Sequence, residues 1–227
     1  SVPAEPRRKH TMQDGTGRTK QTETLVRQAT DALGQSAWFD AEHAASKAMA
    51  SCRARTDWDM MIELALILRE ARKGRRSSSQ VKGAVRILDE DIPEDMEFTS
   101  GRYLVQPPRV GADARRVRLQ CLEDGIPVLV VCREPTTVAG QVPIVAIAPG
   151  TTVRTKVDPP SNERKPTAAW FQSALDALAD AAMERIDPEQ DVERRIDAIL
   201  GCLDAVPDSD SLHDMLADAC REARDRN

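Results

Sequence analysis

The chain has 227 residues, of which 41% are hydrophobic, 30% are charged and only 3% are aromatic. This leaves room for one large domain or two to three small ones, with modest cores packed mainly by Ala, Leu, Val and Ile. The net charge of −5 is concentrated in residues 161–227, which carry 16 acidic and 8 basic side chains. Nucleic acid is therefore not expected as the main partner, because such binding depends on neutralising phosphates and on aromatic stacking.

The residue composition also allows predictions about membrane insertion, the redox state of the compartment and metal binding. No stretch approaches the ~20 uninterrupted apolar residues that a membrane helix requires, so no membrane insertion is expected. The five cysteines form an odd set without a CxxC pair, which predicts free thiols, a reducing compartment and hence a cytoplasmic protein. The three histidines lie in separate segments, so no metal site is predicted, and no motif requires a cofactor.

Residues 1–22 are polar and show no hydrophobic periodicity, which predicts a disordered tail. Within it, Asp14–Lys20 is rich in glycine and threonine and invites comparison with a phosphate-binding loop. The segment lacks the spacing of that loop, and no strand precedes it. We therefore assign it to the tail.

Residues 23–76 predict a helical hairpin followed by a third helix, because apolar residues recur at three- and four-residue spacing. Gly34 is expected to end the first helix and Asp57 to cap the third. The third helix ends in a basic cluster, which consists of Arg69, Arg72, Lys73, Arg75 and Arg76. This cluster is a candidate contact for an acidic protein partner, including the chain's own acidic C-terminal helices. The alternative is a solvated helix end.

Six positions of the hairpin carry a resemblance to a known family: Leu25, Ala29, Ala32, Ala41, Ala45 and Ala48. Their spacing over residues 25–53 resembles a single degenerate tetratricopeptide repeat, with Trp38-Phe39 in the turn between its helices. The resemblance implies two nested antiparallel helices that offer a concave surface to a partner. No tandem repeat is visible, since a shift of 34 residues places Glu63 at a signature site. A generic alanine-rich hairpin remains the alternative.

Residues 80–160 predict a small α/β module. The expected elements are strands at 81–88, 102–106 and 126–132, a helix at 111–123, and a hairpin of strands 142–148 and 151–157. The strand–helix–strand unit of ~30 residues predicts two parallel neighbours with a right-handed crossover.

The carboxyl ends of two parallel neighbours share one edge of the sheet, where ligands of open α/β sheets bind. Loops 107–113 and 133–137 follow these strands. The candidate ligand contacts in them are Arg109, Gly111, Asp113, Arg133, Glu134 and Thr136. Gly111 precedes a helix N-terminus that could accept an anion. The alternative is that Arg133 and Glu134 pair with neighbouring charges at the rim of the sheet.

Residues 166–227 predict a segment of three amphipathic helices after the Pro159-Pro160 linker. Thr167 is expected to cap the first helix, Asp187 the second, and Asp208 or Ser209 the third. The many carboxylates of this segment fall on the polar faces of the helices and need no further explanation.

The predicted fold is therefore α+β, with N-terminal and C-terminal helical segments flanking a βαβ-plus-hairpin module that holds a mixed sheet. No catalytic motif is present, and the pattern favours a non-catalytic protein–protein interaction or scaffolding protein, including a subunit of a larger assembly. The alternative is a small-molecule or anion-binding module, either sensor or enzyme, at the sheet edge. Neither the partner's identity nor the oligomeric state follows from the sequence.

Overall fold

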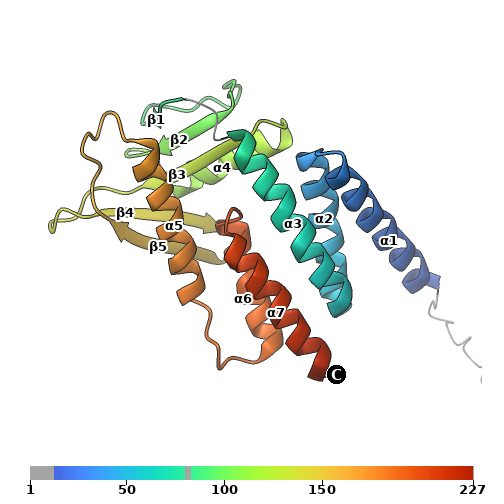
Figure 1. The fold of residues 1–227 in the computed structure, drawn as a ribbon. Coiled ribbons are helices and arrows are strands. Elements are labelled where there is room, and N and C mark those ends of the chain that lie inside the picture. The colour runs from blue at the N-terminus through green and yellow to red at the C-terminus, as the bar shows by residue number, and fades with distance from the viewer. Residues whose placement is uncertain (1–12, 80–82, 227) are drawn as a thin grey trace, which may run out of the picture.

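The computed structural model describes residues 13–79 and 83–226. These residues form seven α-helices and one five-stranded mixed sheet, which confirms the predicted α+β class (Figure 1). The elements in chain order are α1 (Gln13–Gly34), α2 (Trp38–Ala54), α3 (Trp58–Ser79), β1 (Arg86–Leu88), β2 (Gly101–Val105), α4 (Gly111–Glu123), β3 (Val128–Arg133), β4 (Val142–Ala148), β5 (Thr151–Val157), α5 (Ala168–Glu184), α6 (Val192–Ala205) and α7 (Asp210–Arg226).

The first helix is longer than predicted. α1 ends at Gly34 as expected, but it begins at Gln13, so residues 13–22 are helical rather than part of a disordered tail. Thr22 is buried, and its Oγ1 accepts a hydrogen bond of 3.1 Å from Nη1 of Arg55, the residue that follows the C-terminal end of α2. This tertiary contact helps to hold the N-terminal part of α1 in place, although that part has no apolar stripe that would predict a helix. Residues 1–12 of the predicted tail lie outside the described residues.

The N-terminal helices pack in the order α1, α2, α3 (Figure 1). Ala41, Ala45 and Ala48 are fully buried, as a close helical hairpin requires. Trp38 begins α2 instead of lying in the turn, and its ring covers Gly74 of α3. A Cβ at Gly74 would lie 2.4 Å from that ring, so only glycine permits this approach. The burial of the alanines is thus established, whereas membership of the repeat family stays a prediction.

The third helix and the first strand also depart from their predicted bounds. Asp57 caps α3 through a hydrogen bond of 3.3 Å from the backbone N–H of Met60 to its Oδ1. The helix runs three residues beyond the predicted end of the helical segment at residue 76, to Ser79. β1 comprises only Arg86–Leu88, and residues 81 and 82 of the predicted strand lie outside the described residues.

The sheet has the order β1-β2-β3-β4-β5. β1, β2 and β3 are parallel, and Tyr103 of β2 lies opposite Val130 of β3. β4 and β5 extend the sheet as an antiparallel hairpin that turns at Gly150, whose φ of +70° suits glycine. The predicted parallel pair and hairpin are both confirmed.

The two faces of the sheet bury different helices. Tyr103 and Val128 pack against Val117 and Cys121 of α4 on one face. Side chains of the other face, including Leu104 and Leu129, enter the main core with residues of α3, α5, α6 and α7. The N-terminal helices, the α/β module and the C-terminal helices therefore share one core, although the sequence divides them into three segments.

The C-terminal helices are capped by short polar side chains. Thr167 caps α5 as predicted, and Ser209 accepts a hydrogen bond of 3.2 Å from the N–H of Leu212 at the start of α7. The predicted start of α6 at Asp187 is wrong, because Asp187 forms a turn and Asp191 caps the helix instead. Among the described residues, no helix combines the length and the apolar character needed to cross a membrane.

Candidate functional site

The loops that follow β2 and β3 meet at one end of the sheet, as the parallel pairing predicts. Together they line a cleft of about 320 Å³, here called the edge cleft. Its lining residues are Pro107, Pro108, Arg109, Val110, Gly111, Glu134 and Pro135. The two loops that the sequence placed at one edge of the sheet therefore lie next to each other there.

The charged side chains predicted to converge there instead pair with other neighbours. Arg109 Nη1 donates to Asp91 at 3.0 Å. Asp113 Oδ2 accepts from the N–H of Val110 at 2.9 Å and so caps its own helix. Glu134 receives two hydrogen bonds, of 2.8 and 2.9 Å, from Arg154 on β5. Of the six candidate ligand contacts, Arg109, Gly111 and Glu134 line the edge cleft, whereas Asp113, Arg133 and Thr136 do not. Ligand binding by these residues stays a prediction.

Arg133 and Gly111 also have structural roles. Arg133 is buried, and its Nη2 donates to Oγ1 of Thr136 at 3.1 Å and lies 3.8 Å from Glu163. Gly111 faces β4, where an added Cβ would lie 3.3 Å from Ile147. The alternative in which Arg133 and Glu134 pair with charges at the rim of the sheet is thus the one the structure supports.

What remains in the edge cleft is mainly apolar surface. Three prolines and Val110 line it, and Val110 is 57% exposed. Val138, in the loop that continues from Pro135 into β4, is fully exposed. The described residues contain only one other exposed large hydrophobic side chain, Leu66. Two of the three thus lie in the loops at this end of the sheet.

Four of the five residues of the basic cluster contact acidic groups of the same chain. Arg69 pairs with Asp214, Arg72 and Arg75 with Glu42, and Arg76 with Asp210. Lys73 is exposed. All four also reach the C-terminal segment, Arg75 through Asp208 and Arg72 through His213. An acidic partner of this cluster is therefore found within the chain, on α2 and at the start of α7.

Glu42 is the centre of this ion network. Its two carboxylate oxygens lie 2.8 Å from Nε of Arg72 and 3.0 Å from Nε of Arg75, and the side chain is only 4% exposed. Burial alone would raise the pKa of Glu42, but the charges and hydrogen bonds of the two arginines outweigh it and hold the pKa below its ordinary value. The carboxylate is therefore ionised and joins α2 to α3.

His213 is fully buried beside this network. Its Nδ1 lies 2.7 Å from the carbonyl oxygen of Ser209, and its Nε2 lies 3.1 Å from Nη1 of Arg72. Because an arginine can only donate, Nε2 is the acceptor and Nδ1 carries the proton. Burial and the positive charge of Arg72 lower the pKa of His213 to about 3, so the imidazole is neutral.

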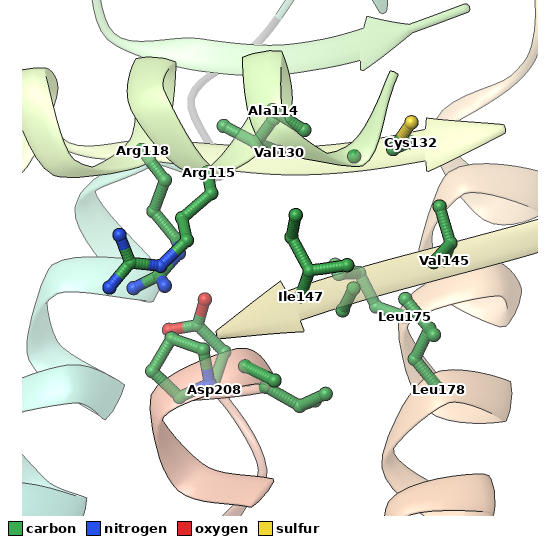
Figure 2. Close-up of a pocket in the computed structure, with 15 residues that line it drawn as sticks. Ala114, Arg115, Arg118, Val130, Cys132, Val145, Ile147, Leu175, Leu178 and Asp208 are labelled. Atoms are coloured by element: carbon green, nitrogen blue, oxygen red, sulfur yellow. The ribbon is translucent and has the colours of Figure 1, made fainter. Parts of the chain in front are cut away.

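A second pocket, of about 40 Å³, lies between α4, β4, α5 and the turn before α7 and is here called the arginine pocket (Figure 2). Its walls are apolar and include Val130, Ile147 and Leu175. At one end the side chains of Arg115 and Arg118 lie next to each other above the carboxylate of Asp208 (Figure 2). Burial lowers the pKa of Arg118 to about 10, and the charge of Asp208 opposes this effect.

Four residues of the ion network and the arginine pocket were not predicted from the sequence: Glu42, His213, Arg115 and Arg118. For the first two, the sequence holds a weak signal. Glu42 lies three and seven positions before the buried Ala45 and Met49, which places a carboxylate on an apolar helical face. His213 stands in the same relation to Leu216 and Cys220. Arg115 and Arg118 carried no such signal, because their surroundings come from distant segments.

The described residues contain no cluster of three or more His, Cys, Asp or Glu side chains suited to a metal ion. No protein-family model, curated protein or solved structure matches the chain.

Proposed function

We propose that the protein is a non-catalytic interaction or scaffolding protein that binds a partner protein at the edge cleft. The observation that carries the proposal is the apolar lining of that cleft, with Val110 and Val138 exposed in the flanking loops. Exposed apolar surface next to polar rim residues is typical of protein contact sites. A partner would insert an apolar side chain between the two proline-bearing loops.

The pairing of the surrounding charges supports a protein partner over an anion at this edge. Glu134 is occupied by Arg154, and Arg109 by Asp91, so these groups form a polar rim rather than a charged centre. The basic cluster on α3 contributes less to partner binding than its sequence suggests, because its arginines hold the chain's own helices together.

The cytoplasm is the compartment we propose. All five cysteines are buried and free, at positions 52, 121, 132, 202 and 220. Burial raises the pKa of the Cys121 thiol to about 11 and that of Cys132 to about 12, which keeps both protonated and unreactive. Free thiols of this kind suit a reducing environment.

The test is co-purification of the tagged full chain from its native source, compared with a Val110→Asp/Val138→Asp variant. Both valines are exposed, so the fold should persist. The control is Ala50→Asp, the same kind of change at an exposed position on α2. We expect a protein that co-elutes in fixed proportion with the parent and with the control, and that is lost from the double variant. Retention of that protein by the double variant would contradict the proposal.

A further inference from the structure

A groove lies between α5 and the turn that leads into α7, and it is here called the acidic groove. The two helices contact each other, and Figure 1 shows the start of α7 beside α5. The volume of the groove is about 440 Å³, whereas that of the edge cleft is about 320 Å³. It falls in the range of roughly 300–1,000 Å³ that is typical of ligand sites, so the groove can accept a long side chain of a second molecule.

The floor of the acidic groove is apolar. α5 contributes Leu175, Ala179 and Met183, which follow one another at four-residue spacing and therefore lie on one face of the helix. All three are only partly buried, so part of their surface is open to the groove. Val206, in the turn before α7, adds to this surface. The floor therefore offers a contact for a flexible aliphatic chain.

The wall formed by α5 carries negative charge that no cation neutralises. Asp176 and Asp180 line the groove one helical turn apart, and both are exposed. Asp176 accepts a hydrogen bond of 2.9 Å from the neutral amide of Gln172. Within residues 13–79 and 83–226, neither carboxylate forms an ion pair. These two groups are therefore available to a cation from outside the chain.

The carboxylates of the opposite wall already have cations of their own. Asp208 lies 2.9 Å from Nη2 of Arg75, and Asp210 lies 2.7 Å from Nη2 of Arg76. Two of the four aspartates that line the groove are thus neutralised within the chain. The remaining negative charge is concentrated on α5, directly beside the apolar floor.

We propose that the acidic groove binds a basic segment of a partner protein. The alkyl chain of a lysine or arginine would lie along Leu175, Ala179 and Met183, and its charged end would reach Asp176 and Asp180. Lysine and arginine commonly bury their alkyl chains on apolar surface while the charged end stays in water. Side chains one helical turn apart have Cβ atoms about 5–6 Å from each other, so one charged end can contact both carboxylates.

The apolar floor favours a basic side chain over a metal ion. A metal ion would contact the carboxylates and leave the floor uncovered. The described residues also contain no group of three or more His, Cys, Asp or Glu side chains suited to a metal. The combination of charge and aliphatic surface is therefore complementary to lysine and arginine side chains.

The acidic groove is independent of the edge cleft, because no residue lines both. The edge cleft is proposed to accept an apolar side chain, whereas the acidic groove accepts a basic one. A failure of either proposal therefore leaves the other standing.

Fluorescence anisotropy of a labelled peptide of alternating lysine and serine, titrated with the full chain, tests the proposal. We expect saturable binding of this peptide and none of the same peptide with glutamate in place of lysine. A peptide with diaminobutyrate in place of lysine keeps the charge but shortens the alkyl chain, so it should bind more weakly. The Asp176→Asn/Asp180→Asn variant should weaken binding of the lysine peptide about fivefold or more, because two ion contacts are lost.

The matched control is Asp95→Asn/Glu97→Gln, which makes the same change in net charge at two exposed positions outside the groove. This variant should bind the lysine peptide as the parent does. Absence of binding, or an equal loss in the two double variants, would overturn the proposal. Equal affinity for the diaminobutyrate peptide would also contradict it, because the floor would then contribute nothing. Self-association of the parent that Asp176→Asn/Asp180→Asn abolishes would identify a second copy as the occupant and so refute a partner protein.

Discussion

His213 accepts a hydrogen bond from Arg72: its Nε2 lies 3.1 Å from Nη1 of the arginine. The contact joins α7 to α3 inside the protein, where Glu42 of α2 also holds Arg72. A neutral imidazole is essential to this arrangement, because a protonated ring would place a second cation against the guanidinium. The contact therefore couples the stability of the fold to pH.

The first prediction concerns this pH dependence. The pKa of His213 is about 3 in the folded state and has an ordinary value of 6.5 in the unfolded chain. The unfolded state therefore binds more protons below pH 6.5, and the stability contributed by the neutral ring is lost as the pH falls from there toward 3. Urea denaturation at pH 7, 6 and 5 should show the free energy of unfolding falling by up to about 1.4 kcal/mol per pH unit.

A pair of variants isolates the histidine. His213→Gln should flatten the pH dependence between pH 7 and pH 5, whatever its effect on stability at neutral pH. His43→Gln, at an exposed position, should leave the dependence as it is in the parent. If the free energy of unfolding of His213→Gln falls with pH as steeply as that of the parent, another group causes the pH dependence. Below about pH 4.5 protonation of Glu42 should add to the loss, because its folded pKa is also lowered.

The second prediction concerns Glu42 itself. Glu42→Gln removes the charge that Arg72 and Arg75 share and leaves two buried cations short of a counter-charge. We expect a loss of roughly 3–5 kcal/mol in the free energy of unfolding. Glu63→Gln on the exposed side of α3 is the control and should change stability by less than about 0.5 kcal/mol. Equal urea midpoints for the two variants would show that the network contributes nothing.

The third prediction concerns the contact between Trp38 and Gly74. Alanine normally stabilises a helix interior by ~1 kcal/mol relative to glycine. At position 74, however, the added Cβ would lie 2.4 Å from the Trp38 ring, so Gly74→Ala should destabilise the protein by roughly 1–3 kcal/mol in a thermal or urea melt.

Two comparisons test the origin of this loss. Gly34→Ala should show no such penalty, because no atom lies within 4 Å of its Cβ position. In a Trp38→Ala background the penalty of Gly74→Ala should disappear, since the ring that causes it is gone. A penalty that persists there would rule out the ring as its cause.

The fourth prediction concerns the alanine face of α2. Ala45 has no exposed surface, so Ala45→Leu should overpack the contacts among the N-terminal helices and cost roughly 1–3 kcal/mol. Ala50→Leu places the same side chain at an exposed position of the same helix and should be close to neutral. If the two variants melt alike, the face containing Ala45 does not govern hairpin packing.

Much of the fold was predictable because local chemistry and topology agree. The β-branched run that forms β3, the helix that begins at Gly111, and the turn at Gly150 each have a strong local signal. The parallel pairing of β2 and β3 then follows from the rule for strand–helix–strand units. This rule also placed the two loops of the edge cleft side by side.

The predictions from sequence failed where contacts between distant segments determine the helix bounds or the partner of a charged side chain. Residues 13–22 have no apolar stripe, and their helix is tied down by Thr22 and Arg55. Asp187 and Asp191 are both good helix caps, and local sequence does not choose between them. In the edge cleft, the sequence located the loops but not the partners of their charges, because Glu134 pairs with a residue 20 positions away on another strand.

The packing of α3 against α7 has a consequence for the timing of folding. Arg69 and Asp214, which join these helices, are 145 positions apart in the chain. At ribosomal rates of ~5–20 residues per second, α3 waits on the order of ten seconds for α7 to emerge. We expect the nascent hairpin to expose the side of α3 that faces α7 during this interval. That exposure would make the partly synthesised protein a substrate for chaperones.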